Sequence, residues 1–120
     1  SSAASDVYKR QEYILLLTLK AGEYTGSRVS DVDLFRIRNA MPHLAETLKK
    51  SLRPGDAVAQ FSDSQYVILL SACTYEGGML AANRIISKFY QDHKVYRNLK
   101  IKIHIEKVKT AEHILNKYSG

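Results

Sequence analysis

Hydrophobic and polar residues follow two different periods along this chain, and the shorter period marks the strands. Residues 13–19 are apolar except for Thr18, which predicts a strand buried on both faces. Residues 57–61 and 66–70 are short apolar runs on either side of the polar cluster 62–65, as in a β-hairpin. Near the C-terminus, apolar and polar residues alternate, which predicts a strand with one solvent-exposed face. The apolar positions are Leu99, Ile101, Ile103 and Ile105, and the polar ones are Lys100, Lys102, His104 and Glu106.

Steps of three and four residues mark two helices. The first begins near Asp33, with Asp31 or Asp33 as its N-cap. Pro42 should kink this helix or break it near Met41, and the pair Pro54-Gly55 should end it and turn the chain into the hairpin. Its apolar face is predicted to consist of Leu34, Ile37, Met41, Leu44, Leu48 and Leu52.

The second helix is predicted over residues 76–90, with Thr74 as its cap. The element order β-α-β-β-α-β favours a ferredoxin-like α+β sandwich, in which an antiparallel sheet carries two main helices on one face. Residues 13–19 and 66–70 are expected to be the central strands, and a last helix over residues 110–118 to close the other face. The side chains of the second helix expected in the core are Leu80, Ala81, Ile85, Ile86 and Phe89.

The composition is that of one globular domain, since 45% of the 120 residues are hydrophobic and 25% are charged. Residues 1–11 lack periodicity and resemble translated sequencing-adapter sequence, so we expect a non-native or disordered tail before a single domain over residues 12–120. The natural protein is then expected to extend further upstream. No apolar run is long enough to cross a bilayer, and the single Cys73 favours a reducing compartment, so a cytoplasmic protein is predicted.

Two segments resemble a known family. The first is Arg53-Pro-Gly-Asp56, five residues, and then Ser62-Asp63-Ser64-Gln65-Tyr66; the second is Ala82-Asn83-Arg84-Ile85. In the order and spacing of these segments, the chain resembles a degenerate GGDEF domain, the diguanylate cyclase module of bacterial signalling proteins. Ala111-Glu112 weakly matches the closing motif of that family. The resemblance extends roughly from residue 13 to residue 106 and implies the same α+β fold.

The resemblance also implies that the catalytic groups are missing. Cyclases of this family hold two divalent cations with carboxylates from the end of the first strand and from the hairpin. This chain has Thr18-Leu19-Lys20 at the first position and Ser64-Gln65 at the second, and Asp63 replaces a glycine that lets substrate approach. The loop over residues 20–31 replaces a guanine-holding helix. We therefore expect no enzyme, no cofactor and no metal, and the four histidines share no metal-ligand spacing.

Arg53 and Asp56 form an Arg-x-x-Asp motif, the one motif of the family that is intact in this sequence. In the resemblance, this motif corresponds to the inhibitory site that binds cyclic di-GMP (c-di-GMP). An arginine can donate to O6 and N7 of guanine while a carboxylate accepts from N1 and N2. The alternative is structural, because Pro54, Gly55 and Asp56 also suit a tight turn that needs no ligand. Gln60 stands where the family has a supporting arginine.

The net charge of +6 leaves a second function open, that of a basic ferredoxin-like nucleic-acid-binding domain. Lysines on an edge strand also prevent unwanted strand pairing, and no aromatic residue accompanies those of residues 100–106, so nucleic acid is the weaker interpretation. The sequence favours a non-catalytic GGDEF-like regulatory or interaction module of a bacterial signalling or transcription-regulatory protein. Its expected partners are an upstream domain or a homodimer partner, and c-di-GMP, with no membrane.

Overall fold

The computed structural model describes residues 11–21 and 31–108 and has the predicted element order. The predicted helix over residues 110–118, the tail over residues 1–10 and most of the 20–31 loop lie outside the described residues. Gln11 belongs to the first strand, although it was expected in the tail. The elements are β1 (Gln11–Lys20), α2 (Asp31–Ser51), β2 (Ala57–Ser62), β3 (Gln65–Cys73), α3 (Tyr75–Asp92), the short 3-10 helix η1 (Lys94–Tyr96) and β4 (Lys100–Lys107).

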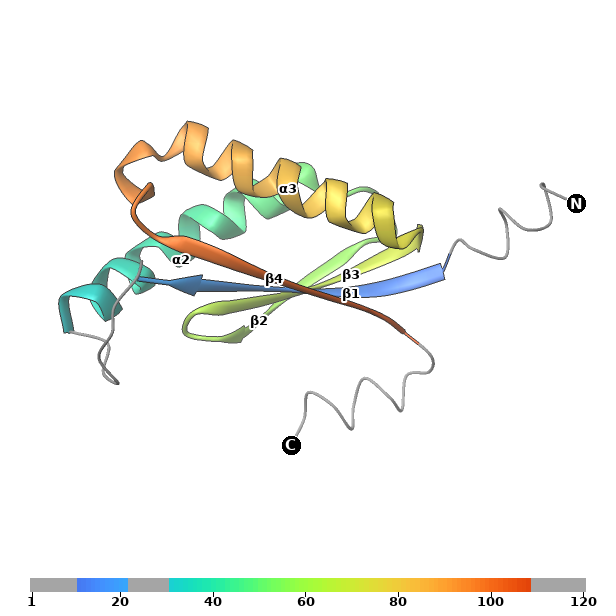
Figure 1. The fold of residues 1–120 in the computed structure, drawn as a ribbon, viewed down its shortest axis with the longest axis horizontal. Coiled ribbons are helices and arrows are strands. Elements are labelled where there is room, and N and C mark those ends of the chain that lie inside the picture. Colours follow the sequence, from blue (N-terminus) through green and yellow to red (C-terminus); the bar gives the residue numbers. More distant parts are fainter. Residues whose placement is uncertain (1–10, 22–30, 109–120) are drawn as a thin grey trace, which may run out of the picture.

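The four strands form one antiparallel sheet in the order β2-β3-β1-β4. The strands β1 and β3 are central, as predicted. Both helices pack on one face of the sheet (Figure 1). The chain is therefore an α+β protein with a four-stranded antiparallel sheet and two main helices, an architecture compatible with a ferredoxin-like or GGDEF-like fold.

The core lies between β1 and the two helices. Leu15, Leu17 and Leu19 face the helices and are almost completely buried. On the opposite face of β1, Ile14 is only 2% exposed, while Leu16 is half-buried. The predicted burial of the second face of β1 is thus found at Ile14 and in part at Leu16. Next to Ile14, an apolar hollow in this face is lined by Ala57, Val58, Ala59, Val67 and Leu69.

Of the two outcomes expected at Pro42, a kink or a break near Met41, the break is wrong, because helix α2 runs without interruption from Asp31 to Ser51. The Tyr66 hydroxyl donates a hydrogen bond of 2.9 Å to the Met41 carbonyl and so fixes the helix to β3 at this point. Asp31 and Asp33 lie inside the first turn, where their charges favour the positive end of the helix dipole. Leu34 was expected in the core but is 42% exposed. Ile37, Met41, Leu44 and Leu48 are buried as predicted, whereas Leu52 lies just beyond the end of the helix and is half-buried against the core.

Helix α3 begins as predicted, with the Thr74 side chain accepting a hydrogen bond of 3.0 Å from the Gly77 N–H. The prediction for Leu80 was wrong, because this residue is 69% exposed. The buried positions are Gly78, Ala82, Ile85 and Phe89. A Cβ atom at Gly78 would collide with the Cδ1 atom of Ile105, so the small residue lets α3 approach β4 closely.

Neither described helix combines the length and the apolar character that a membrane span requires.

Candidate functional site

The hairpin of β2 and β3 carries both groups of residues that the sequence singled out, one at each end. The turn Arg53–Asp56 precedes β2, and Asp63 and Ser64 form the tip between β2 and β3. Six residues of β2 separate them, and at about 3.3 Å per residue this places the two groups roughly 20 Å apart. They are therefore two separate sites.

The first site is a tight turn closed by its own residues. The Asp56 N–H donates to the Arg53 carbonyl at 3.0 Å, and Gly55 has a φ of +96°, as the third residue of a type II turn with proline before it requires. The Arg53 N–H in turn donates to Oδ2 of Asp56 at 3.0 Å. The residue types that matched a ligand motif are thus also those that the turn requires.

The Asp56 carboxylate is used inside the protein. Its side chain is 3% exposed, and Oδ1 accepts hydrogen bonds from the Ser71 N–H at 3.1 Å and from the Ser71 hydroxyl at 3.4 Å. Burial acts to raise the pKa of Asp56, but the N–H donors of Ser71 and Arg53 and the charge of Arg53 outweigh it, so this pKa lies below its ordinary value. The carboxylate therefore holds β3 and the turn together.

The Arg53 guanidinium is the part of this site that reaches solvent. Its Nε lies 3.6 Å from Oδ2 of Asp56, and its Nη2 donates to the Ser71 carbonyl at 2.9 Å. The side chain is nevertheless 57% exposed. Asp56 and Ser71 thus fix the orientation of an arginine whose outer surface faces solvent.

At the tip of the hairpin, two uncharged side chains lie opposite each other on β1 and β3. Thr18 pairs with Gln65 in the sheet, and Nε2 of Gln65 donates to Oγ1 of Thr18 at 3.1 Å. The Ser62 hydroxyl donates to Oε1 of Gln65 at 2.9 Å, and it accepts from the Ser64 N–H at 3.3 Å. The two positions that the resemblance compares with metal-binding carboxylates are therefore adjacent in space and bonded to each other.

The charges around this tip are mostly positive. Asp63 is exposed and lies 3.6 Å from Nη2 of Arg38. The sheet register places Lys102 opposite Thr18 and Lys100 opposite Lys20. The positive charges of these lysines repel a cation and attract an anion. Tyr66, the last residue of the degenerate signature, is buried, and burial raises the pKa of its hydroxyl.

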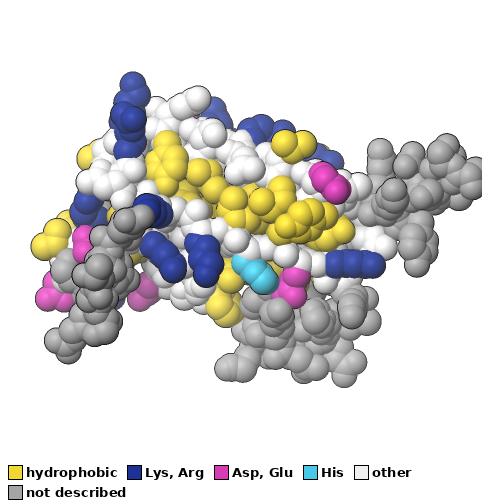
Figure 2. All heavy atoms as spheres, in the orientation of Figure 1, with side chains coloured by type: hydrophobic (Ala, Val, Ile, Leu, Met, Phe, Trp, Pro, Cys, Tyr) yellow, Lys and Arg dark blue, Asp and Glu magenta, His cyan; other side chains and the backbone are white. Residues whose placement is uncertain are grey.

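The outward face of β4 is polar and basic. Its outward residues are Lys100, Lys102, His104 and Glu106, and Figure 2 shows the basic side chains followed by a histidine and an acidic side chain along this strand. His104 is exposed, as predicted, with its Nε2 3.7 Å from Oε1 of Glu106. In the described strand β4 no aromatic side chain accompanies these residues for stacking on bases.

The structure also brings together a group that sequence reasoning missed. The ligand atoms of His43, Glu46 and His93 all lie within 4.8 Å of one another. The spacing of His43 and Glu46, three residues apart in a predicted helix, is visible in the sequence. His93 follows a different helix fifty positions later, so no pattern could have associated it with them.

Comparisons with known proteins support the fold alone. No protein-family model and no curated protein matches the sequence. A solved structure of PelD residues 156–455 from Pseudomonas aeruginosa PA14, in complex with c-di-GMP, is similar, with a TM-score of 0.52 at 13% identity. The similarity covers 98% of this chain and 40% of the PelD chain, so this chain spans less than half of that structure. The similarity agrees with the predicted α+β arrangement of four strands and two helices.

Proposed function

We propose that this chain is a non-catalytic GGDEF-like regulatory or interaction module of a larger bacterial signalling or transcription-regulatory protein, and that it binds c-di-GMP through Arg53. The observation that carries the first half is the hydrogen bond between Thr18 and Gln65. The observation that supports the second half is the exposed, firmly held guanidinium of Arg53. The PelD structure of similar fold contains c-di-GMP.

The proposed absence of catalysis is supported by the lack of carboxylates at Thr18 and Gln65 and by the positive charge of Lys102. Two-metal phosphoryl chemistry needs carboxylates that neutralise the cations and orient the triphosphate. Thr18 and Gln65 offer a hydroxyl and an amide that already satisfy each other. Lys102 lies opposite Thr18 in the sheet and adds a positive charge to this part of the sheet, which disfavours a cation there.

The binding proposal assigns different tasks to the two residues of the turn. A guanidinium is a rigid fork of donors that suits the O6 and N7 acceptors of guanine or a phosphate. Arg53 supplies this fork at the surface, whereas Asp56 is buried and bonded to Ser71. Arg53 is therefore the residue that contacts the ligand, and Asp56 positions it.

Calorimetric titration with c-di-GMP tests the binding proposal. We expect saturable binding by the wild-type chain and none by Arg53→Ala, with Arg53→Lys much weaker because lysine lacks the planar fork. Arg38→Ala is the matched control, since Arg38 is also an exposed arginine in an ion pair of 3.6 Å with an aspartate, but at the other end of the hairpin. A wild-type chain that is folded and gives no heat contradicts the proposal, and so does equal loss in the two alanine variants.

Incubation with GTP and either Mg²⁺ or Mn²⁺ tests the absence of catalysis. No cyclic product is expected above a control without protein. The double variant Thr18→Asp with Gln65→Glu should remain inactive, because Lys102 stays beside the new carboxylates and the guanine-holding helix of the family has no counterpart in the sequence. Product formed by the wild-type chain would overturn the proposal.

A further inference from the structure

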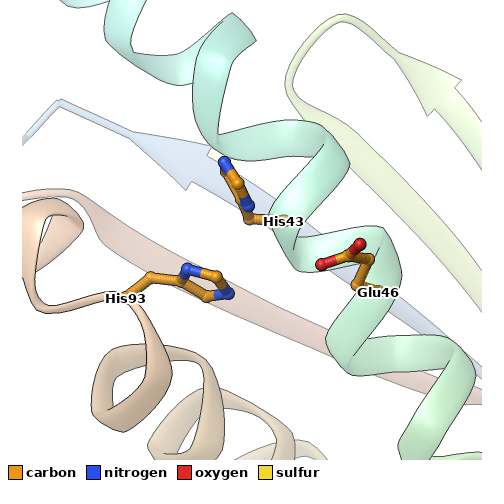
Figure 3. A group of neighbouring side chains, drawn as sticks. All are labelled: His43, Glu46 and His93. Atoms are coloured by element: carbon orange, nitrogen blue, oxygen red, sulfur yellow. The ribbon is translucent and has the colours of Figure 1, made fainter.

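A compact group of three metal-ligating side chains lies between the two helices. His43 and Glu46 project from the same side of α2, three residues apart, and His93 is the residue that ends α3. Figure 3 shows the three side chains converging on the space between α2 and the end of α3. Their ligand atoms lie within 4.8 Å of one another.

Aromatic packing positions the two imidazoles. The ring centroids of His43 and His93 are 4.6 Å apart, and Phe89 lies 5.5 Å from His93. Tyr96 stacks on Phe89 and lies 5.7 Å from the His43 ring. The His93 N–H also donates to the Phe89 carbonyl at 2.9 Å, which fixes the backbone at the end of α3. Glu46 is exposed and can change its rotamer at little cost.

We propose that His43, Glu46 and His93 bind a divalent transition-metal ion, for which Zn²⁺ is the reference, with the remaining coordination position taken by water. Two imidazole nitrogens and one carboxylate oxygen are a set that Zn²⁺ uses in proteins, whereas Mg²⁺ and Ca²⁺ prefer oxygen ligands alone. Bonds of about 2.0–2.1 Å to a tetrahedral ion place ligand atoms roughly 3.4 Å apart. The ligand atoms lie within 4.8 Å of one another, so binding would require a small further approach, which the exposed Glu46 side chain can supply by changing its rotamer.

The bound ion would join α2 to α3. These two helices come from opposite halves of the chain, and each packs on the sheet through its own apolar face. An ion that binds only the folded chain stabilises it by mass action. The bound ion would therefore stabilise the folded chain, and this effect is independent of the proposed binding of c-di-GMP at Arg53.

Zn²⁺ titration of the chelator-treated full chain, in competition with a chromogenic chelator, tests the proposal. We expect one ion per chain, and we expect Co²⁺ to give the visible absorption of a low-symmetry site. Glu46→Gln should lower the Zn²⁺ affinity by about tenfold or more, since even the loss of a residue that only supports a ligand costs 10–100-fold. His104→Gln is the control, because His104 lies 3.7 Å from a carboxylate but in no group of three among the described residues.

Thermal unfolding provides the second measurement. Zn²⁺ should raise the midpoint temperature of unfolding of the wild-type chain and of His104→Gln. It should leave the midpoint temperature of His93→Gln unchanged. The exposed Glu46 can be replaced without disturbing the aromatic cluster, so its result stands even if a histidine variant does not fold. Equal Zn²⁺ affinity in wild type and Glu46→Gln, or a loss of affinity in His104→Gln as large as in Glu46→Gln, would overturn the proposal.

Discussion

Replacing Asp56 by alanine should destabilise the fold far more than the same replacement of an exposed aspartate. The change removes the acceptor for the backbone N–H groups of Arg53 and Ser71, which lie 3.0 and 3.1 Å from the carboxylate oxygens. A donor left without its partner in a buried place costs about 1–3 kcal/mol. Because the Arg53 N–H lies at the exposed turn and can bond to water, while the Ser71 N–H is partly buried, we expect the free energy of unfolding to fall by about 1–3 kcal/mol.

Urea denaturation at neutral pH, followed by circular dichroism, measures this loss. Asp63→Ala is the control, because Asp63 is 82% exposed in its ion pair with Arg38, and exposed pairs contribute less than about 1 kcal/mol. Asp56→Asn keeps one acceptor oxygen and should lie between wild type and Asp56→Ala. A loss below about 0.5 kcal/mol in Asp56→Ala would refute the structural role of the carboxylate.

The same residue gives a pH dependence with a definite sign. The pKa of Asp56 in the folded chain lies below its ordinary value of 3.8. The folded state therefore binds this proton more weakly than the unfolded state, and the carboxylate contributes its full stabilisation above the unfolded pKa. As the pH falls through the folded pKa, this contribution is lost. The stability difference between wild type and Asp56→Asn should shrink below about pH 4 and stay constant above pH 5; a difference that grows on acidification would contradict this sign.

Three further predictions concern packing and backbone conformation. Gly78→Ala should cost about 1–2 kcal/mol because the new methyl group meets Ile105, and Ile105→Val should relieve part of this loss in the double variant, as urea denaturation would show. Tyr66→Phe should cost about 1 kcal/mol, since it removes the buried hydrogen bond to the Met41 carbonyl; an unchanged urea midpoint would contradict this. Ala72 has a φ of +50°, so Ala72→Gly should raise the thermal midpoint by removing strain, and a lowered midpoint would argue against strain there.

The element order could be predicted because each element carries a strong local signal. Strict alternation marked β4, and the side chain of Thr74 caps α3 as its position before the helix suggested. Pro54 and Gly55 marked the turn before β2, where Gly55 adopts the positive φ. Each of these signals acts within a few residues, so the sequence alone is sufficient to show it.

The helix faces were harder to predict, because the large apolar side chains expected in the core are not all buried. In α3 the face toward the sheet is set by Gly78 and Ala82, whose small side chains allow close approach, and the larger Leu80 points away. In α2, Leu34 lies in the first turns, which project beyond the end of β1 (Figure 1) and so have no sheet to pack on. Neither fact follows from apolar periodicity.

The candidate site was only half visible in the sequence. Thr18 and Gln65 are paired across β1 and β3, and the roles that the family resemblance gives to these two positions stay predictions. The burial of Asp56 could not be predicted, because its partner Ser71 lies in β3, fifteen residues away. The break expected near Met41 was wrong, since the helix continues through Pro42 to Ser51.

The central position of β1 also determines the order in which the chain can fold. Both neighbours of this first strand come later in the sequence, and β4 is the last described element. The hairpin of β2 and β3 closes over two residues, whereas pairing β1 with β4 closes a loop that contains every other described element. Local pairing is fast and distant pairing is slow. During synthesis, one edge of β1, the most apolar of the described strands, must therefore stay unpaired until β4 leaves the ribosome, and a chain that ends before Lys100 exposes that edge permanently.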